Sequence, residues 1–217
     1  MKPARTPEKL QQVVRNLKIG DLILVHTKKD PISSLIRLTT ESYWTHVALV
    51  FDVPHTIAKG VSLDEVLIVE TAPGEPLAVH RLQHYLTQPD KYDLGFKRMP
   101  GMSDEERERF RGFFLEVLDT PYDLFRVFLM FAQMVYTWIA KVNVSFRAAG
   151  QMITTRRYIC TTFAQRAYYL AVAPHKRHLV LFRGHEHDIG FLEQMEKITP
   201  ATIASSPNTV WLHNPHR

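Results

Sequence analysis

The stretch RRYICTTFAQRAYYL, residues 156–170, contains the single cysteine of this 217-residue chain. The apolar pattern after Cys160 predicts a helix that ends before Pro174, so the thiol would lie in the first turn. Unpaired N–H groups and the positive end of the helix dipole lower the pKa of a thiol placed there. A lone cysteine is also a common small apolar residue of protein cores. The sulfur alone therefore leaves a nucleophile and a core residue as two open interpretations.

Composition indicates one folded domain over residues 1–217, because 45% of the residues are hydrophobic and the length suits a single domain. One cysteine cannot close an internal disulfide, and the first residues lack the apolar core of a secretory signal. We therefore expect a cytoplasmic protein with a free thiol. The formal net charge of +5 favours anionic partners such as lipid headgroups, so peripheral membrane contact is a further expectation. The cations are scattered, so no nucleic-acid partner is expected, and the oligomeric state is left open.

Hydrophobic periodicity and capping signals predict a series of strands and helices. Asp30 is the expected N-cap of a short helix over 30–40. Ser103 and Glu106 form a capping-box pattern before a helix that stops ahead of Pro121. Strands are expected at 20–26, 45–53, 65–72 and 92–99, and further helices at 7–17, 160–173 and within 183–197. The closing residues 207–217 either dock as a strand or lie loose.

The segment LFRVFLMFAQMVYTWIAKVNVSF, residues 124–146, is almost continuously apolar. Its uncharged run between Arg126 and Lys141 has 14 residues, short of the roughly 20 that cross a bilayer. A buried or surface-lying helix fits better. We expect the single domain to carry an apolar helical insertion at about 124–150 and a C-terminal extension at about 175–217.

A cysteine hydrolase also needs a base and a group that orients the base. Among the 11 histidines, His46 differs because it opens a predicted strand, a rigid element able to aim a side chain. If strands 46–52 and 66–71 pair antiparallel, opposite residues have numbers that sum to about 116 or 117, and His46 plus Glu70 gives 116. The two side chains then share a face of the sheet. A slip of one residue would instead leave Glu70 as an ordinary edge-strand charge.

Five short motifs, in order, resemble the circularly permuted branch of the NlpC-type papain-like superfamily, which includes the YiiX-like proteins and the lecithin:retinol acyltransferase relatives. The motifs are GDLILVH, SYWTHVALV, VETAPG, TPYD and YICTTF, and the resemblance covers about residues 18–171. It implies an α+β papain-like fold in which an antiparallel sheet packs against helices, with the nucleophile at a helix N-terminus. It further implies Cys160 as nucleophile, His46 as base and Glu70 as orienting residue, with Tyr122 and Thr161 lining the site near the oxyanion. A core tyrosine at a helix end is the alternative interpretation of Tyr122.

Two features depart from the family pattern. Relatives often have a serine and then an acidic residue after the cysteine, where this chain has Thr161 and Thr162. Tyr122 and Cys160 are also 38 positions apart, and most of that interval is the apolar segment 124–146. The segment is either an additional core helix or an apolar wall for a substrate's acyl chain. Candidate substrate-binding residues are Trp44, Phe128 and Phe131.

The expected chemistry is thiolate attack on an amide, ester or thioester carbonyl through a covalent acyl-enzyme, with no cofactor and no metal. The cluster His185, Glu186, His187 and Asp188 lacks metal-ligand spacing. Our first interpretation is an acyl hydrolase or acyltransferase, with a lipid-like acyl substrate in view. The alternatives are an amidase or peptidase acting on peptide or peptidoglycan-like bonds, and a non-catalytic assembly protein, such as a virion component, that keeps the fold.

Overall fold

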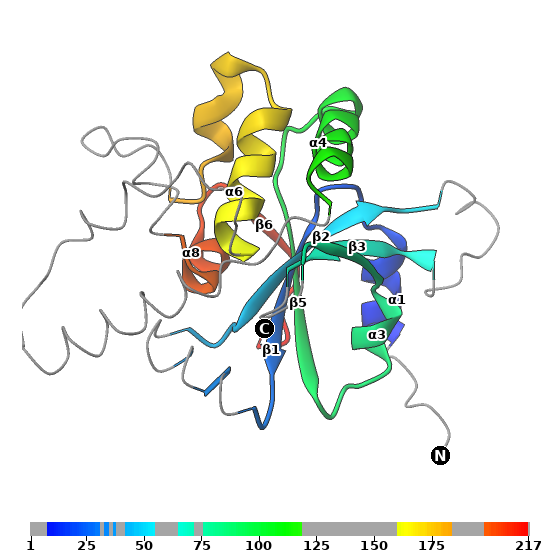
Figure 1. Cartoon of the computed structure of the whole chain (residues 1–217). Helices are drawn as coiled ribbons and strands as arrows, with labels where there is room; N and C mark the ends of the chain where they lie inside the picture. Colours follow the sequence, from blue (N-terminus) through cyan, green and yellow to red (C-terminus); the bar gives the residue numbers. More distant parts are fainter. Residues whose placement is uncertain are drawn as a thin grey trace, which may run out of the picture.

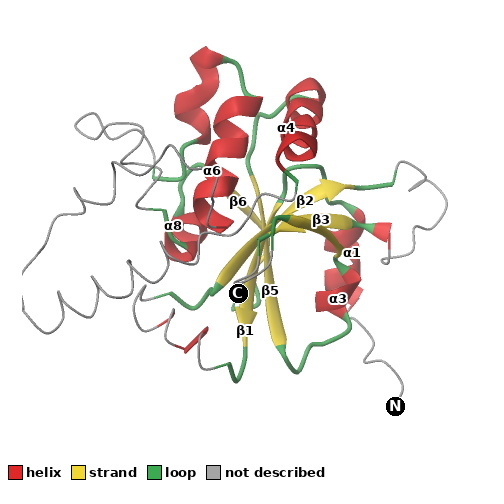
Figure 2. Cartoon of the chain, in the orientation of Figure 1, coloured by secondary structure: helices red, strands yellow, loops and turns green. Residues whose placement is uncertain are grey.

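The structure is a computed structural model that describes residues 8–30, 33–34, 37, 42–54, 65–71, 76–118, 160–183 and 198–216. Within these ranges the chain forms a six-stranded antiparallel sheet in the order β4-β3-β2-β1-β5-β6. The strands are β1 (Leu22–Thr27), β2 (His46–Asp52), β3 (Leu67–Glu70), β4 (Ala78–Arg81), β5 (Tyr92–Arg98) and β6 (Val210–His213). The predicted combination of an antiparallel sheet with packed helices is confirmed (Figure 2).

Helices cover both faces of this sheet (Figure 1). The helical elements are α1 (Glu8–Arg15), α3 (Gln83–Leu86), α4 (Asp104–Val117), α6 (Cys160–Ala171), the 3-10 helix η5 (Pro174–Val180) and α8 (Pro200–Ser205). Helices α4, α6 and α8 pack on one face, and α1 and α3 pack on the other. No helix within the described ranges is long and apolar enough to span a membrane.

The position of β1 inside the sheet explains why its sequence is apolar without alternation. Leu22 and Leu24 join the core under α4 and α6, whereas Ile23 and Val25 join the core under α1. A strand at the centre of a sheet with two covered faces must bury every side chain, so the run LILV carries no polar position. The apolar run of residues 20–26 therefore predicted this strand correctly.

Two predicted helix caps are present. The Ser103 hydroxyl accepts a hydrogen bond from the Glu106 N–H, and the Glu106 carboxylate accepts one from the Ser103 N–H, which begins α4. The Asp30 carboxylate accepts the Ser33 N–H at 2.7 Å, as expected of an N-cap. Most of the helix predicted over 30–40 lies outside the described residues, as do residues 184–197 and the apolar segment 124–146.

The C-terminal residues do dock as a strand. Strand β6 pairs with β5 at the edge of the sheet. Lys97, a residue of β5, also binds the end of helix α8. The buried Lys97 ammonium donates hydrogen bonds to the carbonyls of Ile203 (2.9 Å) and Ala204 (2.6 Å) at the end of α8. A cation at the C-terminal end of a helix meets its unpaired carbonyls and the negative end of its dipole.

Sequence patterns predicted neither β4 nor α3.

Candidate active site

Strands β2 and β3 deliver the two polar side chains that the sequence singled out. Leu49 pairs with Val69 and Val50 with Ile68, so partner numbers sum to 118 rather than the predicted 116 or 117. An irregularity in β2 between Val50 and Asp52 shifts the register, which an estimate from the loop centre does not include. The shift of two residues keeps side chains on their face, so His46 and Glu70 meet diagonally instead of directly opposite.

The resulting contact is a hydrogen bond of 2.8 Å between His46 Nε2 and Glu70 Oε2. The two side chains are 16% and 8% exposed, so water screens the interaction weakly. An ionised carboxylate only accepts hydrogen bonds, so Nε2 of His46 must carry the proton that it shares with Glu70. In the neutral imidazole, Nδ1 then holds the lone pair that can accept a proton. This is the tautomer that a general base needs when its orienting group sits behind it.

Tyr85 completes the pair, and sequence reasoning did not find it. This residue of α3 is buried and donates its hydroxyl to Glu70 Oε2 at 2.6 Å, the same oxygen that contacts His46. The spacing of Leu82, Tyr85 and Leu86 is that of a buried helical face, which marks Tyr85 as a core residue. Nothing in that pattern indicates that its hydroxyl reaches a carboxylate on another strand.

Glu70 is held in its charged form despite its burial. Burial alone would raise the pKa of this carboxyl, but the hydrogen bond and positive charge of His46 lower it, and the Tyr85 hydroxyl and the charge of His80 act in the same direction. The net effect places the pKa of Glu70 below its ordinary value of 4.5. The carboxylate can therefore stabilise the positive charge that His46 gains when it accepts a proton.

Helix α6 begins at Cys160, where the sequence predicted a helix N-terminus, and several contacts fix its first turns. The Thr161 hydroxyl donates to the Ile198 carbonyl at 2.7 Å. Gln165 donates to the Val180 carbonyl and accepts the Phe182 N–H, each at 2.9 Å. Further along, the Tyr168 hydroxyl donates to the Gly20 carbonyl before β1. The Cys160 side chain lies outside the described part of the structure, so the site is built from its partners.

The faces of the sheet constrain how these parts combine. Glu70 contacts Tyr85 of α3, so the Glu70 and His46 side chains lie on the face that α1 and α3 cover. Their neighbours Val47 and Val69 point to the opposite face, into the core beneath α6. His46 is the first residue of β2. A reaction that combines Cys160 with His46 must therefore take place at this end of β2, beyond which the sheet no longer separates its two faces.

A second polar cluster fixes the segment that leads into β2. The Tyr43 hydroxyl donates to Asp93, which also pairs with Lys28 at 2.7 Å, and the Tyr43 ring stacks on His26 at 4.0 Å. His26 Nδ1 lies 2.7 Å from the Tyr43 carbonyl oxygen. Burial and the bonded Asp93 carboxylate raise the pKa of Tyr43, and burial lowers the pKa of His26. Both groups therefore stay neutral at neutral pH and anchor the chain three residues before His46.

The remaining predicted residues fall into two groups. Trp44 is 5% exposed and packs over Gly95 and against Trp211, with ring centroids 6.0 Å apart, so it is firmly held near the start of β2. Its predicted contact with substrate stays a prediction. Tyr122, Phe128 and Phe131 lie outside the described residues, as does the cluster at 185–188. Within the described ranges, no group of three or more His, Cys, Asp or Glu side chains is placed to hold a metal ion.

Comparisons with known proteins show the family and the fold of this chain. Residues 16–213 match the family model described as permuted papain-like amidase enzyme, YaeF/YiiX, C92 family. Among solved structures, the chain is similar to the crystal structure of the metalloprotein YiiX from Escherichia coli O157:H7. The TM-score is 0.51 at 15% sequence identity, over 90% of this chain and 96% of that chain, which shows a shared fold. No curated protein sequence matches this chain significantly.

Proposed function

This chain belongs to the permuted papain-like amidase family, and on that premise we propose that it cleaves an amide bond through a covalent acyl-enzyme on Cys160. His46 is the general base in this proposal, and Glu70 orients it. The observation that carries the proposal is the buried hydrogen bond from His46 Nε2 to the Glu70 carboxylate. Membership of an amidase family supports an enzyme over the non-catalytic alternative.

The proposed reaction proceeds in two steps. His46 Nδ1 takes the thiol proton, the sulfur attacks the carbonyl carbon, and the carbon–nitrogen bond breaks as the imidazolium returns the proton to the leaving amine. Water then attacks the thioester with His46 again as base, which releases the carboxylic acid and restores the thiol. The Cys160 backbone N–H at the start of α6 is the proposed oxyanion donor, with Tyr122 as a second candidate. Glu70 stays ionised throughout and stabilises the imidazolium.

The identity of the second nucleophile separates hydrolysis from acyl transfer. An alcohol or amine that replaces water would make the same site an acyltransferase, and a lipid-like acyl substrate stays part of the proposal. The basis for the lipid proposal is the sequence of segment 124–146, which lies outside the described residues. A series of acyl substrates of increasing chain length tests it, because burial of each methylene contributes about 0.8 kcal/mol. A flat response to chain length would contradict an acyl-chain wall.

The amidase proposal is tested by trapping the acyl-enzyme. Wild-type protein is incubated with activated N-acyl amides, quenched in acid and digested. The mass of the peptide that contains Cys160 is then measured by mass spectrometry. We expect the acyl mass on that peptide, and its loss in the Cys160→Ala and His46→Ala variants. Glu70→Gln should slow acylation without abolishing it, because the base is still present but less well oriented. Turnover that survives Cys160→Ala would overturn the proposal.

A further inference from the structure

The hydroxyl of Thr71 is a buried polar group that makes no hydrogen bond. Thr71 is 2% exposed, and within the described residues its Oγ1 is the one buried side-chain oxygen that lacks a hydrogen-bond partner. Burial of an unpaired hydroxyl is unfavourable, because the group gives up its hydrogen bonds to water and gains none from the protein. Most buried hydroxyls in native proteins are therefore paired, and an exception calls for a specific explanation.

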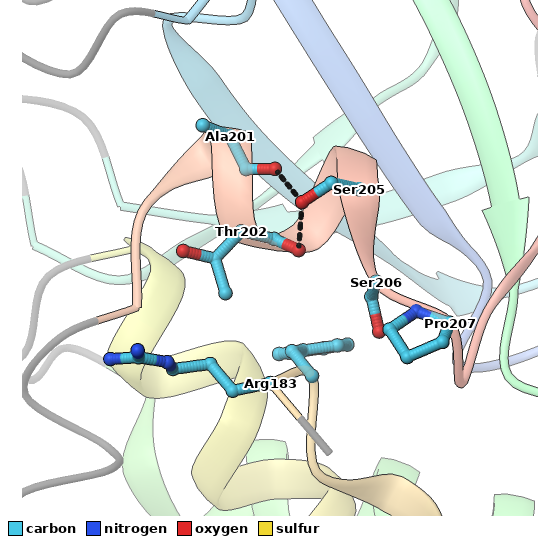
Figure 3. Close-up of a pocket in the computed structure, with 7 residues that line it drawn as sticks. Arg183, Ala201, Thr202, Ser205, Ser206 and Pro207 are labelled. Carbon is cyan, nitrogen blue, oxygen red and sulfur yellow. Dashed lines mark hydrogen bonds between the residues drawn. The ribbon is translucent and has the colours of Figure 1, made fainter.

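Three other hydroxyls of the described chain show the ordinary behaviour. Thr45 and Thr161 are also buried, and each donates its hydroxyl to a backbone carbonyl. Even the exposed Ser205, which lines a cavity of about 440 Å³ beside α8, donates to two carbonyls of its own helix (Figure 3). Thr71 differs from all three, although it is the least exposed of them.

Thr71 lies at the end of the sheet where the candidate site assembles. It directly follows Glu70, the last residue of β3, so strand alternation places it on the opposite face, which is the face of Val69 beneath α6. Continuing the β2–β3 register from Val69 by two residues brings Thr71 opposite Val47, which follows His46 and belongs to the same core as Val69. Thr71 therefore lies beside the start of β2, on the face that α6 covers.

Helix α6, which packs on β2, places Cys160 toward the same end of the sheet. The Tyr168 hydroxyl donates to the Gly20 carbonyl, and the Gly20 N–H donates to the Val50 carbonyl, so this part of α6 lies near the C-terminal half of β2. From Tyr168 to Cys160 the helix spans roughly 12 Å, and from Val50 to His46 the strand spans roughly 13 Å. In Figure 1, α6 and β2 both run downward toward their first residues. The two elements therefore begin near the same end of the sheet, which is also where β3 ends.

We propose that the Thr71 hydroxyl is an oxyanion donor, which donates a hydrogen bond to the carbonyl oxygen of the scissile amide beside the Cys160 backbone N–H. The inference rests on the proposed function. As the Cys160 sulfur bonds to the carbonyl carbon, the carbonyl electron pair moves to the oxygen, and Thr71 stabilises this charge while it keeps its own proton. A donor that has no other partner breaks no hydrogen bond before it meets the developing charge.

The variant Thr71→Val tests this assignment, because it removes the hydroxyl and keeps the shape of the side chain. Acylation of Cys160 by 4-nitrophenyl acetate is followed through the released nitrophenolate, with Cys160→Ala as the blank. We expect Thr71→Val to acylate about 100-fold more slowly at saturating ester with little change in KM, and Thr71→Ser to retain most of the wild-type rate. The midpoint of thermal unfolding should not fall in Thr71→Val, because the free protein loses no hydrogen bond.

Alkylation by iodoacetamide is the matched control reaction, because the sulfur displaces iodide at a saturated carbon and no oxyanion forms. Thr71→Val should be alkylated at the wild-type rate. Thr209→Val is the matched control variant, since the buried Thr209 hydroxyl donates to the Ser206 carbonyl. This variant should lower the midpoint of thermal unfolding and leave the acylation rate unchanged.

The outcomes separate this inference from the proposed function. If wild type forms the acyl-enzyme and Thr71→Val forms it at the same rate, the inference is overturned and the proposed function stands. A slower rate that comes with a lower thermal midpoint, or with equally slow alkylation, would also overturn the oxyanion role. If wild type itself forms no acyl-enzyme at Cys160, the proposed function falls, and the role of Thr71 falls with it.

Discussion

Replacing Tyr85 with phenylalanine removes one hydroxyl from the carboxylate that contacts His46. The lost hydrogen bond is 2.6 Å long, and both partners are buried. A hydrogen bond to a charged group contributes roughly 1.5–3 kcal/mol, so we expect Tyr85→Phe to lower the free energy of unfolding by about 2 kcal/mol at neutral pH. The aromatic ring and its packing remain, so the change isolates the hydroxyl.

The pH dependence of this loss separates the proposed role from simple packing. The pKa of Glu70 in the folded protein lies below its ordinary value of 4.5, so its charged form adds stability above that pH. This contribution disappears as the pH falls through the folded-state pKa. The cost of Tyr85→Phe should therefore be full at neutral pH and should shrink as Glu70 becomes protonated. The assay is urea unfolding of both proteins over a series from neutral to acidic pH.

Tyr92→Phe provides the matched control. Tyr92 packs edge-on against Tyr85 with ring centroids 4.8 Å apart, but its hydroxyl does not contact Glu70 in the described contacts. Removal of the Tyr92 hydroxyl should lower the free energy of unfolding by less than Tyr85→Phe does, and this loss should not follow the titration of Glu70. Tyr85→Phe should also lower kcat more than it raises KM, because a loosened Glu70 orients His46 less well. Equal costs for the two variants, or a Tyr85→Phe cost that is constant with pH, would refute the reasoning.

Other predictions concern the parts that hold the site in place. Gly95→Ala should destabilise the protein by about 1–3 kcal/mol in thermal unfolding, because an added Cβ would lie 2.6 Å from the Trp44 ring. An unchanged midpoint would show that Trp44 is not held as described. Lys97→Met should cost roughly 2–4 kcal/mol at neutral pH, because the carbonyls at the end of α8 lose their partner. Burial lowers the pKa of Lys97 to about 8, below the unfolded value of 10.5. Wild type should therefore gain stability relative to Lys97→Met as the pH rises from about 8 to 10.5. A difference in the free energy of unfolding that stays constant over this pH range in urea titrations would contradict this. Ser103→Ala should cost about 1 kcal/mol through the lost capping box, and a loss below a few tenths would argue against that cap.

Much of the fold could be predicted because its signals are local. The unbroken apolar run of β1 and the capping box of α4 are each written in a few adjacent residues, and both elements are present. The strand β4 was missed because AVHR is short and lies at the sheet edge, where its side chains are largely accessible and carry no buried pattern. Helix α3 was missed because four residues are too few to establish a helical period.

The candidate site shows the same division between local and distant information. Period-two alternation placed His46 and Glu70 on one face, and this held although the predicted register was off by two residues. The irregularity after Val50 depends on how β2 pairs with β3, so no local pattern reveals it. The hydrogen bond from the Tyr85 hydroxyl to Glu70 joins two separate elements, α3 and β3. Such contacts exist only once the chain has folded.

The central claim is that His46 activates the Cys160 thiol, and the most direct test is the rate of Cys160 alkylation as a function of pH. An unactivated thiol has a pKa of about 8.5 and reacts in proportion to its thiolate fraction. We predict that wild-type Cys160 reacts rapidly at neutral pH, and that His46→Ala shifts its profile to that of an ordinary thiol. Glu70→Gln should give an intermediate profile. Identical, ordinary profiles in wild type and His46→Ala would contradict the account.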